Sequence, residues 1–173
     1  MKLRIFLLTI FIASSCIAFG QVPAPGSNIT RSSLDKFEGT WKWTSGSSEV
    51  IIQLKKFHYY FTDHQFYEDI ILGSHKYTNN GTLIEDYLPD FINISQSFQS
   101  SLFLYAEMDG TLTDNISGDL KDNSKHKRDL LQLTYIPGST PTLIWHLQPQ
   151  GDAIALPVIA GVTLPEDLIL VKQ

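Results

Sequence analysis

Apolar and polar residues alternate with a period of two through most of the chain, which predicts β-strands rather than helices. The alternation is clearest in residues 37–44, where Phe37, Gly39, Trp41 and Trp43 share one face. Two of the three tryptophans lie there, and a buried aromatic side chain removes roughly 150–250 Å² from water. We therefore expect this stretch to be the strand on which the core is built.

Short runs of the same kind, separated by turn residues, continue to the end of the chain. Strands are predicted over residues 49–61, 66–77, 82–86, 101–108, 112–120, 128–136, 141–147 and 167–172. Asn79-Asn80-Gly81 is the clearest hairpin turn, because asparagine and glycine tolerate the positive φ of a two-residue turn. About eight to ten short strands and one helical turn predict an all-β antiparallel meander that closes into a β-barrel; a β-sandwich is the alternative.

Some local features are expected to interrupt this pattern. The apolar positions change parity between Leu54 and Phe57, which predicts a bulge or turn at Lys55-Lys56. Gly73 is expected to break its strand. Residues 149–165, apolar but punctuated by proline and glycine, are expected to form a loop packed on the body.

The N-terminal stretch has the pattern of a secretory signal peptide. Lys2 and Arg4 precede an apolar run, and small residues end at Gly20, where cleavage is expected. The apolar run is shorter than the about 20 residues that span a bilayer. We therefore expect an exported protein, located in the periplasm, the outer envelope or the medium, with no membrane insertion after residues 1–20 are removed.

Cys16, the single cysteine, raises an alternative. Ala13-Ser14-Ser15-Cys16 is weakly similar to a bacterial lipoprotein cleavage box, which normally has leucine in place of Ala13. A lipid on Cys16 would anchor the protein to a membrane. After ordinary cleavage the exported chain has no cysteine, so its core alone must hold the fold.

Beyond the signal peptide we predict a flexible segment, residues 21–31, and a single β domain over residues 32–173. Cleavage changes the net charge from −5 to −7, because both charged residues that are lost, Lys2 and Arg4, are basic. An acidic surface favours solubility and argues against nucleic acid as a partner.

Gly39-Thr40-Trp41 follows a short helical turn and opens the first strand of the meander. In this place it resembles the Gly-x-Trp signature of the lipocalin and fatty-acid-binding-protein group. The resemblance implies a lipocalin-like barrel in which Trp41 packs across the closed end, beneath a basic residue of a late strand. Lys172 is the candidate for that residue and Arg128 the alternative, where the group usually has an arginine.

Three further segments extend the similarity over nearly the whole chain. They are Leu34-Asp35-Lys36-Phe37, Tyr67-Glu68-Asp69-Ile70-Ile71-Leu72-Gly73 and the ending Leu168-Ile169-Leu170-Val171-Lys172. With them the chain resembles a family of short exported proteins from Bacteroidetes-type bacteria that is catalogued as a domain of unknown function. The resemblance implies export and fold, and lends no activity.

The residue patterns give little support for enzymatic chemistry. Glu68 and Asp69 are adjacent and face opposite sides of a strand, which argues against a paired acid–base site and favours a salt bridge to Lys76. No Gly-x-Ser-x-Gly elbow is present. The histidines show no metal-ligand spacing, and exposed or capping positions are expected for all of them: His58, His64, His75, His126 and His146. We predict a protein that is not an enzyme and uses no metal or cofactor.

Aromatic residues gather on either side of the turn near residue 63. They are candidates to line a pocket for a small hydrophobic ligand at a barrel mouth; the alternative is cross-strand pairing that stabilises a hairpin. The residues are Phe57, Tyr59, Phe61, Phe66 and Tyr67.

The leading hypothesis is a non-enzymatic exported barrel that binds a small hydrophobic molecule or simply packs its own interior. The second is an envelope or surface protein that interacts through a strand edge or the 149–165 loop, and the third is a hydrolase. The face bearing Val50, Ile52 and Leu54 discriminates between the first two. A void of roughly a few hundred Å³ behind it favours the binder, and bulky side chains favour the interaction protein.

Overall fold

A computed structural model of the protein describes residues 23–91, 100–106 and 114–173. The predicted signal peptide with Cys16 lies outside these residues. The described strands are β1 (Asn28–Ile29), β2 (Gly39–Ser45), β3 (Ser48–Phe61), β4 (Phe66–Asn79), β5 (Thr82–Asp86), β6 (Leu102–Ala106), β7 (Asn115–Asp122), β8 (Lys127–Ile136), β9 (Thr142–Ala153) and β10 (Asp167–Lys172). The helical segments are η1 (Ser32–Phe37), α2 (Leu88–Phe91) and η3 (Asn123–Lys125). None of these described helices has the length and apolar character needed to cross a membrane.

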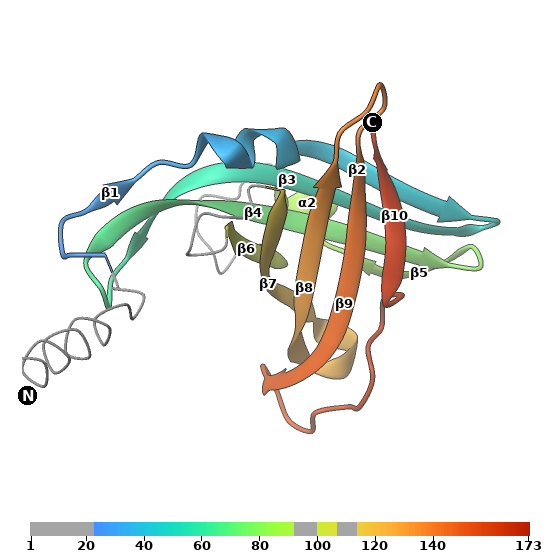
Figure 1. The fold of residues 1–173 in the computed structure, drawn as a ribbon. Helices are drawn as coiled ribbons and strands as arrows, with labels where there is room; N and C mark the ends of the chain where they lie inside the picture. Colours follow the sequence, from blue (N-terminus) through green and yellow to red (C-terminus); the bar gives the residue numbers. More distant parts are fainter. Residues whose placement is uncertain (1–22, 92–99, 107–113) are drawn as a thin grey trace, which may run out of the picture.

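Eight strands close into an antiparallel barrel in the order β2-β3-β4-β6-β7-β8-β9-β10 (Figure 1). The last strand closes it by pairing with the first, so that Lys172 lies opposite Trp41. β1 and β5 lie outside the barrel, and both pair with the edge of β4 that also carries β6. The all-β prediction of a closed meander is confirmed, and the sandwich alternative is wrong.

One end of the barrel is closed by η1 and by Trp41. Trp41 and Phe37 are fully buried, and the indole Nε1 of Trp41 donates a hydrogen bond to the Phe37 carbonyl at 2.8 Å. The Tyr135 ring of β8 meets both rings edge-on, with centroid separations of 5.9 and 6.2 Å. Lys172 places its ammonium 5.1 Å from the centre of the Trp41 ring. The closed end therefore has the arrangement that the Gly-x-Trp resemblance implied.

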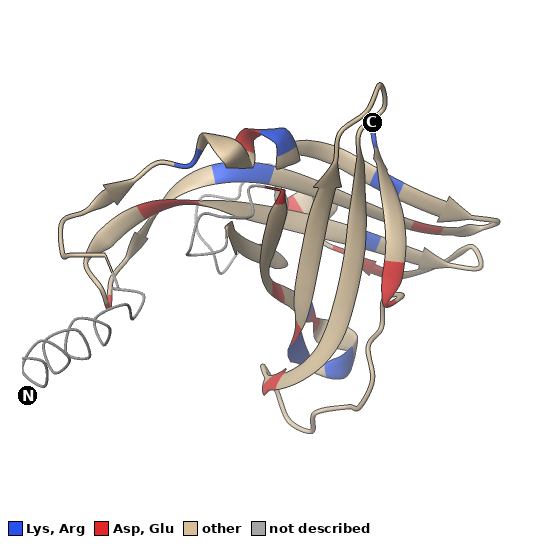
Figure 2. Cartoon of the chain, in the orientation of Figure 1, with Lys and Arg blue, Asp and Glu red and all other residues tan. Residues whose placement is uncertain are grey.

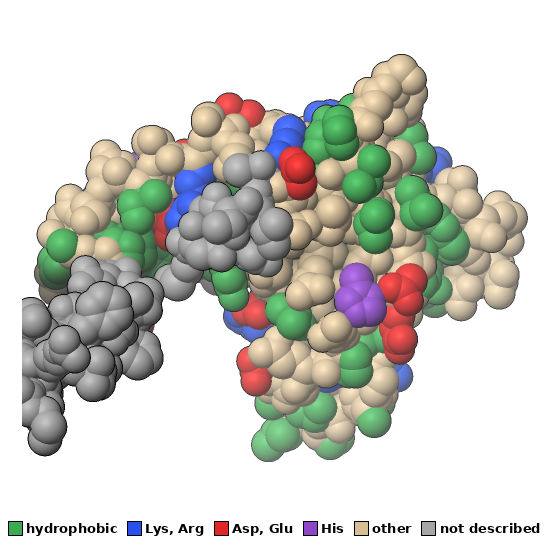
Figure 3. All heavy atoms as spheres, viewed as in Figure 1, with side chains coloured by type: hydrophobic (Ala, Val, Ile, Leu, Met, Phe, Trp, Pro, Cys, Tyr) green, Lys and Arg blue, Asp and Glu red, His purple; other side chains and the backbone are tan. Residues whose placement is uncertain are grey.

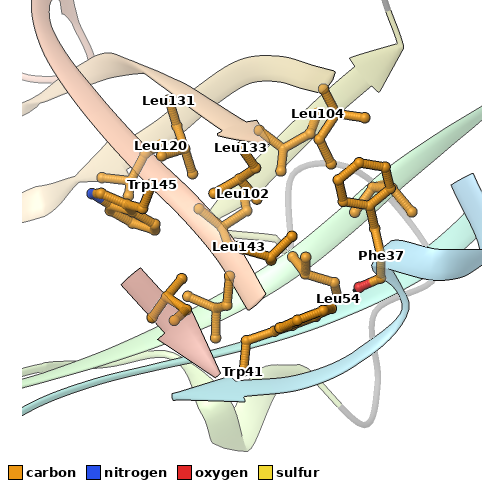
Figure 4. Packing of buried hydrophobic residues seen from close by; sticks show 14 of the residues in the cluster. Phe37, Trp41, Leu54, Leu102, Leu104, Leu120, Leu131, Leu133, Leu143 and Trp145 are labelled. Atoms are coloured by element: carbon orange, nitrogen blue, oxygen red, sulfur yellow. Dashed lines mark hydrogen bonds between the residues drawn. The ribbon is translucent and has the colours of Figure 1, made fainter. Parts of the chain in front are cut away.

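Side chains fill the barrel behind β3. Val50, Ile52 and Leu54 are at most 2% exposed and belong to one continuous core that includes Trp41 and Trp145 (Figure 4). The other labelled members are Phe37, Leu102, Leu104, Leu120, Leu131, Leu133 and Leu143. Bulky side chains thus occupy the space where a void would have favoured an interior ligand.

β3 and β4 form one long hairpin in which every residue of β3 from Glu49 to Phe61 faces a partner in β4 without a shift of register. The bulge predicted at Lys55-Lys56 is therefore wrong. β3 is buried on one face before Lys55-Lys56 and on the opposite face after it. Residues up to Leu54 pack into the barrel, whereas Phe57 and its alternates pack into a second cluster on the other face. The change of parity in the apolar positions of β3 therefore reflects a change in which face of the strand is buried.

Of two other predicted interruptions, the break at Gly73 is wrong, and the loop predicted over residues 149–165 begins only after Ala153. Gly73 lies inside an unbroken β4, where a Cβ atom would approach the Gln53 carbonyl and the Leu54 side chain to 2.7 Å. Glycine is therefore required by close packing. Pro149 lies inside β9, which extends to Ala153. The β8–β9 ladder shifts its register near this proline, and such irregularities tolerate a residue without an N–H group.

Two turns test the predictions that were made from local sequence patterns. Asn80 and Gly81 have φ values of 48° and 81°, which confirms the predicted hairpin turn between β4 and β5. η1 confirms the predicted helical turn, but its N-cap is Arg31, which makes no side-chain capping hydrogen bond.

Replacing Trp41 with alanine is expected to lower the free energy of unfolding by about 3–5 kcal/mol, because a fully buried aromatic side chain is removed. Ile169→Ala is the control: Ile169 is 60% exposed on the neighbouring β10, and its loss should cost under about 1 kcal/mol. Urea denaturation followed by circular dichroism measures both values. Equal losses in the two variants would contradict the role given to Trp41.

Candidate functional site

A cavity of about 840 Å³ lies against the outside of β6, β7 and β8, and we call it the outer groove. Its strand residues alternate with buried core residues and therefore point away from the barrel interior. The groove is lined by Tyr59, Ser100, Ser101, Phe103, Asp119, Lys121, Asn123, His126, Arg128, Ile154 and Ala155.

The turn between β7 and β8 creates a cationic wall of the groove. It sets Lys121 directly opposite Arg128 in the ladder. The Arg128 guanidinium donates a hydrogen bond to the Asp119 carboxylate at 3.1 Å. No ion pair found within the described residues includes Lys121. Arg128 thus has a carboxylate partner, and Lys121 has none among the described residues.

His126 ties the loop after β9 to this turn. Its carbonyl accepts hydrogen bonds from the backbone N–H groups of Ile154 and Ala155, at 2.9 and 3.2 Å. Its ring Nδ1 donates to the Pro157 carbonyl at 2.9 Å, since a carbonyl oxygen can only accept. These bonds hold Ile154 and Ala155 in place as a further wall of the groove.

The aromatic wall comes from β3 and β6. The Tyr59 and Phe103 rings meet edge-on with centroids 5.5 Å apart. Both pack with Phe57 and Phe61 over the buried side chains of β4. An aromatic surface and a cationic surface therefore border the same cavity.

Four of the five aromatic residues predicted to line a pocket lie on one face of the β3–β4 hairpin. Phe57, Tyr59 and Phe61 share a cluster, and Phe66 stacks on Phe61 with centroids 5.0 Å apart. Tyr67 lies on the opposite face, 44% exposed and stacked on His58. Tyr59 is the one that lines the outer groove.

A buried polar array lies next to the groove at Ser101. His75 is fully buried, with its Nδ1 2.8 Å from the Ser101 hydroxyl and its Nε2 3.0 Å from the Glu85 carboxylate. The other oxygen of Glu85 accepts hydrogen bonds from the backbone and the hydroxyl of Ser124. The expectation of an exposed or capping position is wrong for His75, because partners on β5 and next to β6 satisfy both ring nitrogens.

The order Ser–His–Glu is that of a hydrolase triad, but the hydroxyl is poorly placed for attack. Ser101 is 3% exposed, and its oxygen also accepts a hydrogen bond from the His75 backbone N–H at 3.1 Å. Its proton donates to His75 Nδ1 when Nε2 carries the proton shared with Glu85. A saturated buried network of this kind fixes the relative positions of β4, β5 and the start of β6.

Hydrogen bonds within this array favour the ionised form of the Glu85 carboxyl group. Burial alone raises the pKa of the Glu85 carboxyl group, but hydrogen bonds from His75 and Ser124 outweigh it and hold the pKa below its ordinary value. Burial, together with the charges of Glu85 and Asp122, raises the pKa of Tyr87 to about 12. Glu85 is therefore ionised and Tyr87 neutral at pH 7.

Glu68 and Asp69 find partners other than the predicted Lys76. Glu68 pairs with Arg31 at 2.5 Å, and Asp69 lies 2.7 Å from the ring of His58. Burial raises the pKa of the Asp69 carboxyl group, but hydrogen bonds from Arg31 and His58 bring it below its ordinary value. Across the described ranges, His, Cys, Asp and Glu side chains form no group of three or more suited to a metal ion.

The chain belongs to DUF6705, a family of unknown function whose model matches residues 1–173. The expected membership in a family without an assigned function is confirmed. No curated protein and no solved structure matches the chain. Family membership therefore assigns no ligand or activity to the outer groove.

Glu85→Gln should alter the dependence of stability on pH. The folded pKa of Glu85 is lower than the unfolded value of about 4.3, so its ionised form stabilises the fold above that pH. This contribution disappears as the pH falls through the folded pKa. At pH 7 we expect the variant to lose about 1–3 kcal/mol of unfolding free energy, and we expect the difference from wild type to shrink below about pH 4.

Urea unfolding at a series of pH values measures this difference. Glu166→Gln is the matched control, since Glu166 is exposed and should give a curve parallel to that of the wild type. A Glu85→Gln curve that also runs parallel to the wild type would contradict the role given to the Glu85 carboxylate.

Proposed function

We propose that this member of a family without an assigned function is an exported, non-enzymatic binding protein. Its ligand is a small hydrophobic molecule held in the outer groove. The observation that carries the proposal is the groove itself, whose volume of about 840 Å³ falls within the range of about 300–1,000 Å³ for small-molecule sites. The barrel is lipocalin-like in this proposal, with its binding site moved from the interior to the outside.

Packing of the core supports the outside location. Trp41, Ile52 and Trp145 belong to one core cluster, and all three are fully buried. A ligand inside the barrel would have to displace such side chains, and removing one large apolar side chain from a core typically costs about 2–5 kcal/mol. A ligand can bind in the outer groove without displacing core side chains, so its binding avoids that cost.

The aromatic wall supports an apolar body in the ligand, while polar side chains make up most of the described lining. Phe103 and Tyr59 present ring surface to the groove, and Ile154 adds an aliphatic group from the loop. Burial of apolar ligand surface against them contributes about 25 cal/mol per Å². The rings are held by edge-to-face packing, so little ordering is required when a ligand binds.

The buried array supports a non-enzymatic role. Its serine hydroxyl already donates to and accepts from His75, and its carboxylate is occupied by His75 and Ser124.

Export is proposed from the signal-like pattern of residues 1–20.

One surface favours a second candidate function, a protein-interaction module. The outer face of β8, β9 and β10 exposes four large aliphatic side chains at 37–60% of their area: Ile136, Ile144, Ile169 and Val171. Ile144 and Ile169 are directly opposed in the ladder. Figure 3 shows hydrophobic side chains gathered on this side of the barrel. An apolar patch on a sheet face is a common site of protein contact.

Filling the groove tests the small-molecule proposal. We expect N-phenyl-1-naphthylamine, a neutral apolar fluorophore, to bind the wild-type protein with an increase in emission. Ala155→Trp places a large ring against the groove and should weaken this binding by about tenfold or more. Leu156→Trp is the control, because the neighbouring Leu156 is 83% exposed and does not line the groove.

A titration of each variant followed by fluorescence gives the dissociation constants. Equal weakening by both substitutions would contradict the groove as the site. Absence of probe binding to the wild-type protein would favour the interaction module.

A further inference from the structure

We propose that the ligand of the outer groove is an amphipathic anion, an apolar molecule that carries one carboxylate, sulfonate or phosphate group. This inference rests on the proposed function, because it names the ligand class of the same groove. It is carried by the combination of an aromatic and a cationic wall around one cavity.

The cationic wall is costly without an anion. Lys121 and Arg128 are directly opposed neighbours on adjacent strands, and like charges in that position destabilise a sheet. Asp119 offsets Arg128, while Lys121 has no ion-pair partner in the described parts of the chain. An anion bound beside Lys121 would relieve this repulsion.

The cationic wall also has a charge opposite in sign to the net charge of the whole protein, which is −5. Acidic residues outnumber basic ones by 18 to 13, yet among the described residues Lys121 and Arg128 line the groove with Asp119 as the single acidic residue. Figure 2 shows basic residues at the start of β8 and in η3, with acidic residues beside them at the same end of the barrel. A local cationic site on an acidic protein selects for an anion close to the site rather than for a polyanion.

The two walls are spaced to hold both ends of such a molecule. Phe103 is opposed to Asp119 in the β6–β7 ladder, and Lys121 lies two residues further along β7. This step is about 7 Å along a strand. An anionic group at Lys121 therefore leaves the apolar body of the ligand beside Phe103 and Tyr59.

The test compares two probes that differ by one charged group. 8-Anilinonaphthalene-1-sulfonate carries a sulfonate on the same anilinonaphthalene skeleton as neutral N-phenyl-1-naphthylamine. We expect the wild-type protein to bind the sulfonate about tenfold more tightly than the neutral probe. The preference should fall as sodium chloride is added, because salt screens an exposed charge pair.

Variants of Lys121 test whether this residue is the source of the preference for the sulfonate probe. Lys121→Gln should weaken sulfonate binding by about tenfold and change binding of the neutral probe by less than about twofold. Lys121→Arg keeps the charge and should retain tight binding, which separates loss of charge from loss of structure. Lys42→Gln on β2 is the control, with the same change in net charge away from the groove.

Each outcome decides the inference. Tighter sulfonate binding that is lost in Lys121→Gln and retained in Lys121→Arg supports it. Equal affinity for the two probes, or equal effects of Lys121→Gln and Lys42→Gln, overturns it. If the neutral probe still binds and Ala155→Trp still weakens it, the groove proposal stands without the anion. If neither probe binds, both proposals are overturned.

Discussion

The packing of Trp41 across one end of the barrel is the interaction on which the rest of the structure depends. Its indole N–H bonds to the Phe37 carbonyl of η1, Tyr135 of β8 packs against its ring, and Lys172 of β10 covers it. Four elements separated along the chain thus meet at one side chain. The closed barrel that results has eight strands, a number whose interior is just wide enough for side chains to fill. A solid interior follows from closure, and it leaves the outside of the barrel for binding.

The long β3–β4 hairpin connects the core to the candidate site. One of its faces supplies Ile52 and Leu54 to the barrel interior, and the other supplies Tyr59 to the aromatic wall of the groove. Gly73 allows the strands to approach closely where β6 begins to pair with β4. Because β6 carries Phe103, this close approach also sets the Phe103 ring against Tyr59. Core packing and groove geometry are therefore parts of one arrangement.

Much of the fold could be predicted from the sequence because its signals are local. Alternation placed most of the strands, and the positive φ required after Asn79 placed the β4–β5 turn. The pairing of the last strand with the first followed from the resemblance around Trp41. The bulge predicted at Lys55-Lys56 was wrong because a change in hydrophobic parity has two causes, and only tertiary packing separates a bulge from a change of covered face.

The candidate site was harder to predict because its residues come from distant segments. His75 was assigned to the surface, yet its partners lie 10 and 26 residues away and become neighbours only when β5 and β6 pair with β4. One signal for the cationic wall was present in the sequence. Lys121 and Arg128 lie close in the sequence on either side of the turn between β7 and β8, so hairpin pairing alone places them side by side. The position of the cationic wall relative to Ile154 depends on the loop after β9, which carries no periodic pattern.

The central claim is that the barrel interior is closed and the binding surface lies outside it. Amide chemical-shift mapping of the protein during a titration with N-phenyl-1-naphthylamine tests this most directly. The account predicts that shifts concentrate at Phe103, Lys121, Asn123 and Ala155, which line the outer groove. Shifts centred on Val50, Ile52 and Leu54 would contradict it, because they would place the ligand inside the barrel.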